Sequence, residues 1–148
     1  MSPPTKAAPT ARQDGDRYFH HDADIGVIGQ GASIEEAFVE AARAMFELVS
    51  NLSEVRPSEH FDVVFDEPDV ELALTVWLNA LVAEAQSRHV IFSRFTLRRD
   101  GNHWHGTASG ERWRPDLERG VEVKGATLTM LSVRRTGETW EARCVVDV

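Results

Sequence analysis

Apolar side chains recur at helical intervals in two segments of the chain. The first segment begins at Ser33, whose spacing to Glu36 matches a capping box, and its single apolar stripe ends near residues 50–51. The second segment, residues 70–86, follows Asp69 as a potential cap and is apolar on nearly every side. The pattern therefore predicts one helix with a single buried face and one central core helix.

Strand-like patterns fill most of the remaining sequence. Short β-branched or alternating runs occupy residues 18–21, 61–67, 91–99, 103–109, 122–135 and 138–148. Asp100–Gly101 and Thr136–Gly137 supply turns between successive runs. Gly26, Gly29 and Gly31 favour turns or caps, so the chain is expected to bend sharply before the first helix.

Two helices between groups of strands predict an α+β fold. We expect a two-layer single domain in which a mostly antiparallel or mixed sheet carries both main helices on one face. The 148-residue length suits one domain. Residues 1–16 are rich in Pro, Ala and Thr and have almost nothing bulky to bury, which predicts a flexible N-terminal tail before a folded domain at 17–148.

Charge is unevenly distributed and argues against several classes of function. The net charge is -8, from 24 acidic and 16 basic residues, and residues 17–87 hold 14 acidic but three basic residues. A protein that grips phosphate backbones by itself is usually strongly basic, so direct, stable nucleic-acid binding is not expected. No apolar run approaches the ~20 residues of a membrane span, and no signal peptide is apparent. With Cys144 as its single cysteine, the chain suits the reducing cytoplasm, without membrane association.

The C-terminus carries the most suggestive candidate chemistry. Asp147 precedes Val148, so a side-chain carboxylate and the terminal carboxylate lie close together in sequence. If the last strand lay beside the first, Asp147 would approach Asp22 or Asp24. Converging carboxylates repel one another unless a proton or cation joins them, and oxygen ligands favour Mg²⁺, Ca²⁺ or Mn²⁺. The alternative is that Asp147 is a solvated residue at a strand end.

Histidines offer weaker candidates. His21 belongs to a HHDAD run that suits a metal site, an acid/base pair or an ordinary turn. His103 and His105 would share one face of a strand, either as a metal clip or, as we favour, as the polar face of a hairpin. Cys144 alternates with apolar residues, which indicates a small core residue and not a nucleophile.

Several motifs together resemble the archease family. They are HxADIG at 21–26, SxEEAF at 33–38, ARAMFEL at 42–48, WLNALV at 77–82, FSRF at 92–95, a Gly-Glu pair at 110–111, VKGAT at 123–127 and VVDV at 145–148. The resemblance runs in family order from about Tyr18 to the last residue. One departure is that Leu128 and Thr129 stand where archeases often have Tyr and His.

The resemblance implies a role as a protein partner and not as an enzyme. Archeases assist RtcB-type RNA ligases, which use GTP and divalent metal to join a 2′,3′-cyclic phosphate or 3′-phosphate end to a 5′-hydroxyl in tRNA splicing and RNA repair. The family promotes guanylylation of the ligase and so permits multiple turnover. This chain is accordingly expected to be a non-catalytic activator of such a ligase.

The resemblance also assigns residues. It implies a divalent metal site, for Ca²⁺ or for Mg²⁺ or Mn²⁺, at Asp24, Asp147 and Val148. Lys124, from the family's VKA segment, is a candidate to face the ligase or its nucleotide, and His21 and Glu111 are further candidates for such a partner-facing role.

Two other functions remain open at this point. One is a metal-dependent phosphoester hydrolase, with metal at Asp24 and Asp147 and His21 as the base. The other is a chaperone-like interaction module that depends on the acidic surface and the apolar helix instead of a metal.

Overall fold

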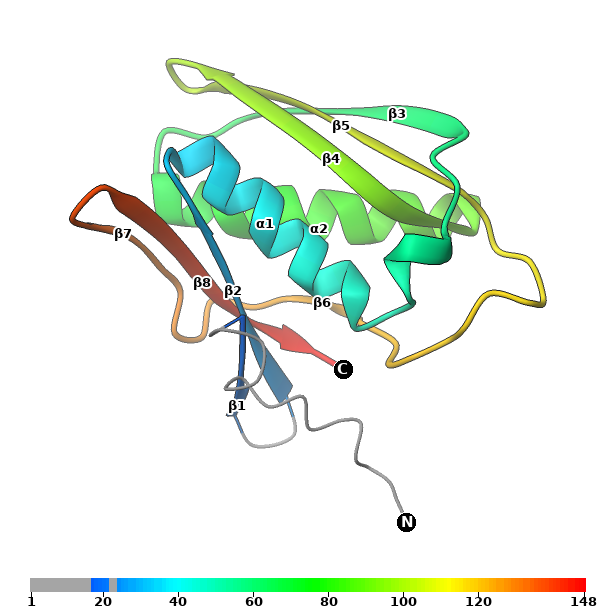
Figure 1. The fold of residues 1–148 in the computed structure, drawn as a ribbon. Helices are drawn as coiled ribbons and strands as arrows, with labels where there is room; N and C mark the ends of the chain where they lie inside the picture. The colour runs from blue at the N-terminus through cyan, green and yellow to red at the C-terminus, as the bar shows by residue number, and fades with distance from the viewer. Residues whose placement is uncertain (1–16, 22–23) are drawn as a thin grey trace.

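Two antiparallel sheets enclose both helices in the structure, a computed structural model that describes residues 17–21 and 24–148. Figure 1 shows α1 and α2 lying between the sheets. The elements in chain order are β1 (Tyr18–His21), β2 (Asp24–Gly31), α1 (Ile34–Glu47), the 3-10 turn η1 (Leu52–Glu54), β3 (Glu59–Asp66), α2 (Val70–Arg88), β4 (Val90–Asp100), β5 (His103–Arg112), β6 (Gly125–Ala126), β7 (Ser132–Thr136) and β8 (Thr139–Asp147).

The predicted α+β class and antiparallel pairing are confirmed, but the strands form two sheets and not one. The first sheet has the order β1-β2-β8-β6, with β7 also paired to β8, and the second has the order β3-β5-β4. Each helix therefore packs against the inner faces of both sheets. The expected flexible tail, residues 1–16, lies outside the described residues. Within the described ranges, no helix is long and apolar enough to cross a membrane.

Both helices begin where the capping residues predict. The Ser33 hydroxyl accepts a hydrogen bond from the Glu36 N–H at 3.1 Å, and the Glu36 carboxylate accepts one from the Ala32 N–H at 2.9 Å. The Asp69 carboxylate accepts from the Leu72 N–H at 3.0 Å and so caps α2. The bonds from the Glu36 and Leu72 N–H groups satisfy backbone donors that the first helical turn leaves without partners.

Helix α2 is the central core helix, as its apolar sequence predicts. Its fully buried Trp77 donates from Nε1 to the Phe38 carbonyl of α1 at 3.0 Å, which pairs the buried indole N–H. Phe38 in turn stacks on Trp104 of β5, with ring centroids 5.3 Å apart. The core thus extends from α2 through α1 to the second sheet.

The prediction of turns at Gly26, Gly29 and Gly31 was wrong, because all three lie within strand β2. Their role is to let neighbouring groups approach the strand closely. A Cβ at position 29 would lie 2.1 Å from the Ala37 carbonyl oxygen of α1, and one at position 26 would overlap the Phe19 ring at 2.1 Å. Glycine at these positions therefore permits close packing instead of a bend.

The predicted continuous strand at residues 122–135 was also wrong. The structure has the two-residue β6 and then β7, separated by a hydrogen-bonded loop in which Met130 has a positive φ of 53°. Asn79 of α2 accepts from the Ala126 N–H at 2.8 Å and donates to its carbonyl at 3.1 Å. This side chain satisfies the outer edge of β6, so the strand needs no further neighbour there.

Candidate functional site

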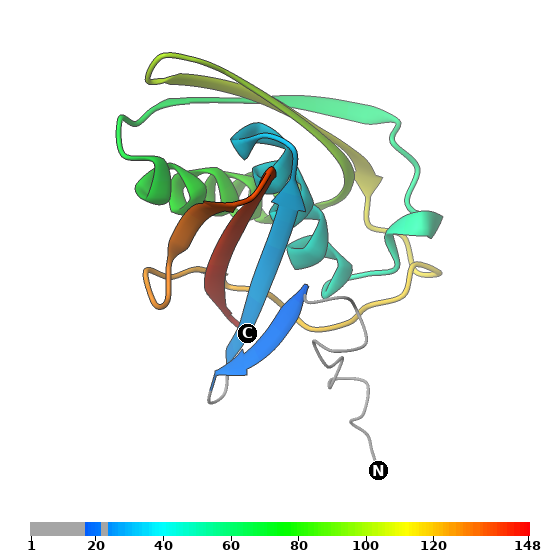
Figure 2. The same cartoon turned by 60° about the vertical axis from the view of Figure 1, so that its left-hand side comes forward.

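The pairing of β2 with β8 brings the first and last candidate carboxylates together. Ile25 lies opposite Val146, so one position further along each strand Asp24 lies across from Asp147. Figure 2 shows the C-terminus beside the first half of β2. The last strand, β8, therefore lies beside β2, the strand that begins at Asp24, and not beside β1.

Strand alternation determines which face these carboxylates share. Ile25 and Val146 belong to the hydrophobic core between the sheet and the helices. Their sequence neighbours Asp24 and Asp147 therefore project from the opposite face of the sheet. Asp24 is partly buried and Asp147 is exposed. No hydrogen bond or ion pair joins either carboxylate to another described residue.

Val148 completes the group that we call the carboxylate end, defined as Asp24, Asp147 and Val148. The Val148 side chain packs against the core, which holds this residue at the strand end. The two aspartate carboxylates are oxygen donors, which suit hard cations such as Ca²⁺, Mg²⁺ or Mn²⁺. Among the described residues no three His, Cys, Asp or Glu side chains gather as a metal-binding group, so the two aspartates supply only part of a ligand set.

Lys124 lies on the other side of β8 from Asp24. Its backbone N–H donates to the Asp147 carbonyl at 2.8 Å, and the next residue, Gly125, pairs with Asp147 in β6. The Lys124 side chain is exposed. His21 pairs with Asp24 across β1 and β2, so its backbone belongs to the same end of the sheet. Asp22 lies outside the described residues.

Glu111 lies in the other sheet and has a different environment. It is 7% exposed at the end of β5 and accepts hydrogen bonds from the Arg56 N–H at 2.7 Å and from Arg114 Nε at 3.0 Å. The hydrogen bond from Arg114, then that from the Arg56 backbone, lowers the pKa of Glu111 below its ordinary value. Arg114 also donates to the Glu54 carbonyl at 3.0 Å. This carboxylate joins the segment between η1 and β3 to the segment after β5, which favours a structural role over contact with a partner.

The two histidines of β5 lie on the outer face of the hairpin, as the alternation predicts, with the buried Trp104 between them. His103 Nδ1 is 2.9 Å from an Asp66 carboxylate oxygen, and His105 Nε2 is 3.4 Å from one of Asp62. Each histidine thus has a carboxylate neighbour on the adjacent strand. These contacts explain both residues as part of a polar sheet surface.

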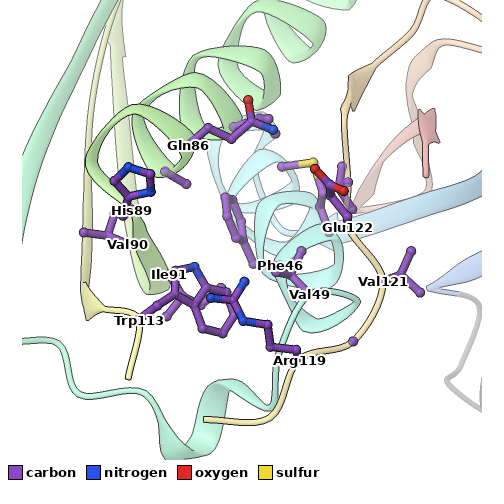
Figure 3. Close-up of a pocket in the computed structure, with 15 residues that line it drawn as sticks. Phe46, Val49, Gln86, His89, Val90, Ile91, Trp113, Arg119, Val121 and Glu122 are labelled. Carbon is purple, nitrogen blue, oxygen red and sulfur yellow. The ribbon is translucent and has the colours of Figure 1, made fainter. Parts of the chain in front are cut away.

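A cavity of about 580 Å³ was not predicted from the sequence. Figure 3 shows it between the ends of α1 and α2, the start of β4 and the segment that follows β5. Its lining residues are Met45, Phe46, Val49, Val82, Ala85, Gln86, His89, Val90, Ile91, Trp113, Arg119, Gly120, Val121, Glu122 and Val123. They come from three stretches of the chain, residues 45–49, 82–91 and 113–123, so no local motif could have indicated the cavity.

Comparisons with known proteins give a consistent result. The model of the Archease protein family (MTH1598/TM1083) matches residues 17–148. The protein archease of Saccharolobus solfataricus is 36% identical over 134 residues, covering 88% of this chain and 96% of that protein. The protein archease of Methanosarcina mazei is 31% identical over 137 residues, covering 88% and 94%.

Solved structures share the fold. The solution structure of protein 1598 from Methanobacterium thermoautotrophicum is 32% identical with a TM-score of 0.80, covering 89% of this chain and 97% of that one. An archease from Thermotoga maritima, described as a possible chaperone, is 24% identical with a TM-score of 0.65, covering 88% and 94%, and supports the fold alone. By sequence over nearly all of its described length, the chain belongs to the archease family.

Proposed function

We propose that this chain is a non-catalytic protein activator of an RtcB-type RNA ligase. In this role it promotes GTP-dependent guanylylation of the ligase and hence multiple turnover in tRNA splicing or RNA repair in the cytoplasm. Membership of the archease family supports a role as a protein cofactor. The more specific assignment of the partner comes from the resemblance of the sequence motifs.

One observation carries the proposal: the fold brings together three of the residues that the resemblance singles out, although Glu111 lies in the other sheet. Asp24 starts β2, Asp147 ends β8 and Lys124 precedes β6, and these three strands are neighbours in one sheet. Asp24 lies far from Lys124 and Asp147 in the sequence, yet all three residues lie at the same end of the sheet. Unpaired carboxylates beside an exposed lysine are suited to contact a cation or a charged partner.

In the proposed function, Asp24, Asp147 and the Val148 carboxylate hold a divalent cation. A bound cation would supply positive charge that stabilises the phosphate oxygens during nucleotidyl transfer. The chain's own contribution is to fix the two aspartates on adjacent strands and to anchor the C-terminus through Val148 packing. Lys124 then offers a further positive charge to the ligase or its nucleotide.

The overall acidity supports association with a basic partner. Residues 17–87 hold 14 acidic and three basic residues, whereas a ligase needs a basic surface to bind RNA. Opposite charges accelerate encounter more than they tighten a complex. The association rate is therefore expected to fall as the salt concentration rises.

The direct test measures GTP-dependent guanylylation of the cognate ligase with and without this protein. The wild type should stimulate it, and Asp24→Ala and Asp147→Ala should each reduce stimulation at least about tenfold, as expected for loss of charge stabilisation. Asp100→Ala is the matched control, because Asp100 is an exposed carboxylate at the end of β4 in the other sheet. Full stimulation by both site variants would refute the proposal.

The same preparations distinguish the alternative functions. Metal-dependent turnover of phosphoesters by the isolated protein would indicate a hydrolase. Suppression of aggregation of unrelated proteins that persists in Asp24→Ala would indicate a chaperone-like module. The proposal predicts neither result.

A further inference from the structure

The cavity between the helix ends and the segment after β5 has an apolar floor and a polar rim. Met45, Phe46 and Ile91 are buried on the floor, whereas Gln86 and Arg119 are exposed at the rim. Its volume of about 580 Å³ falls in the range of small-molecule sites, roughly 300–1,000 Å³. The cavity shares no residue with the carboxylate end.

Backbone hydrogen bonds hold the cavity wall in place. The Gly120 N–H donates to the Val49 carbonyl and the Val121 N–H donates to the Leu48 carbonyl, both at 2.8 Å. Leu48 and Val49 directly follow the last residue of α1. The Trp113 N–H donates to the His89 carbonyl at the end of α2, at 3.1 Å. These bonds tie the segment after β5 to both helix ends, so the cavity is formed before any ligand arrives. They also satisfy helix carbonyls that would otherwise attract a cation.

Arg119 is the feature that indicates what the cavity binds. Its guanidinium carbon lies 3.8 Å from the centroid of the Trp113 ring, and Figure 3 shows the side chain extending across that ring at the cavity edge. Stacking fixes the plane of the guanidinium while its N–H groups point outward from that plane's edges. No hydrogen bond or ion pair joins these donors to another residue in the described part of the chain. A fixed guanidinium with free donors matches a carboxylate, sulfonate or phosphate.

We propose that this cavity binds a small molecule with a planar apolar ring system and one anionic group. The ring system lies on the apolar floor beside Phe46 and Ile91, and the anion accepts hydrogen bonds from Arg119. Arg119 is the one lining side chain among the described residues that is always positive. Glu122 is the opposing rim charge, and it lies across the cavity from Trp113 in Figure 3. The anionic end is therefore directed away from Glu122.

Three probes of similar shape test the sign of the charge: naphthalene-2-sulfonate, 2-naphthalenemethanol and 2-naphthylmethylammonium. Calorimetric titration of the full chain should give one site for the sulfonate and weaker binding of the alcohol and of the ammonium ion, in that order. Amide NMR shifts should locate the sulfonate at Gly120 and Val121 and leave Gly137, in the turn before β8, unchanged. Tighter binding of the ammonium ion, or no saturable binding of the sulfonate, would overturn the proposal.

Variants test the residues. Arg119→Met should weaken sulfonate binding about tenfold or more, since it removes charge-assisted hydrogen bonds, while binding of the alcohol stays unchanged. Arg112→Met is the matched control, because Arg112 is exposed and does not line the cavity. Glu122→Gln should tighten sulfonate binding by removing the opposing charge. Equal sulfonate binding by wild type and Arg119→Met, or weaker binding by Glu122→Gln, would show that the anion does not lie at Arg119.

A cavity-filling variant provides an independent check. Ala85→Phe places a ring into the cavity from α2 and should abolish binding of all three probes. Its thermal unfolding, followed by circular dichroism, establishes that the variant is folded. Retained binding in folded Ala85→Phe would show that the probes bind elsewhere and would overturn the proposal.

Discussion

Glu111 and the carboxylate end show two opposite ways in which this fold uses acidic groups. Glu111 is nearly buried, and every hydrogen-bond donor around it, from the Arg56 backbone and the Arg114 side chain, points at its oxygens. Asp24 and Asp147 lie on adjacent strands of the other sheet, and neither carboxylate has a partner among the described residues. A buried charge must be paired, whereas a repelling pair at the surface costs stability unless something binds to it.

Structural and functional carboxylates in this molecule can be separated by whether the chain itself supplies their hydrogen-bond partners. A carboxylate satisfied within the chain contributes to stability and has little left for a ligand. Two unsatisfied carboxylates held side by side retain their capacity for a cation or a partner. The hydrogen bonds of Glu111 therefore favour a role in stability, whereas the proposed function assigns the cation to the carboxylate end, and each assignment has a measurable consequence.

The largest expected effect on stability is that of Glu111→Gln. The substitution keeps the size of the side chain but removes the charge and turns an amide NH₂ towards donors that need an acceptor. We expect a loss of about 2 kcal/mol in the free energy of unfolding, the scale of hydrogen bonds to charged groups. Urea denaturation followed by circular dichroism measures it.

The control for that experiment is Asp147→Asn, the same change at an exposed carboxylate. Surface substitutions usually alter the free energy of unfolding by no more than about 0.5 kcal/mol. If Asp147→Asn lowered the free energy of unfolding as much as Glu111→Gln, the carboxylates of the two regions would not differ in their contribution to stability.

A smaller effect appears as a dependence of stability on pH. The pKa of Glu111 is lowered in the folded state from an ordinary value of 4.5, so its stabilisation is fully present above pH 4.5. As the pH falls below that value, the unfolded chain binds the proton first, and the stabilisation is lost as the pH falls through the folded-state pKa. The difference in unfolding free energy between wild type and Glu111→Gln should therefore shrink on acidification. Arg114 also lowers the pKa of Asp116. Asp116 therefore contributes a pH dependence of stability with the same sign in the wild type and in Glu111→Gln.

An unchanged difference between pH 6 and the acid limit of folding would contradict this assignment. It would mean that the Glu111 carboxylate is not held in its charged form by Arg114 and Arg56.

Sequence patterns predicted the elements with local signals and missed those that depend on packing. Ser33 and Asp69 predicted where the two helices begin, because a capping residue acts within one helical turn. Gly29 was misread because glycine permits both a turn and a close contact, and the Ala37 carbonyl that requires the contact lies on a helix that packs only in the folded chain. The edge of the short β6 is likewise paired by Asn79, a residue 47 positions away in sequence from Ala126, which no local pattern indicates.

The candidate site divides in the same way. Asp24 and Asp147 were chosen from residue type and family resemblance, and the register of β2 with β8 supplied their proximity. The partners of Glu111 could not be predicted, since Arg56 has no local relation to it and Arg114 lies in an irregular segment. The cavity beside Arg119 was missed for the same reason, because three stretches far apart in the chain form it.

The proposed function requires that the unpaired carboxylates, and not the paired one, bind a divalent cation. Calorimetric titration of the full chain with Ca²⁺, and then with Mn²⁺ and Mg²⁺, tests it most directly. The wild type and Glu111→Gln should show one saturable site for at least one of these ions, and the double variant Asp24→Asn/Asp147→Asn should show none. Binding that survives in the double variant, or that disappears in folded Glu111→Gln, would contradict the claim.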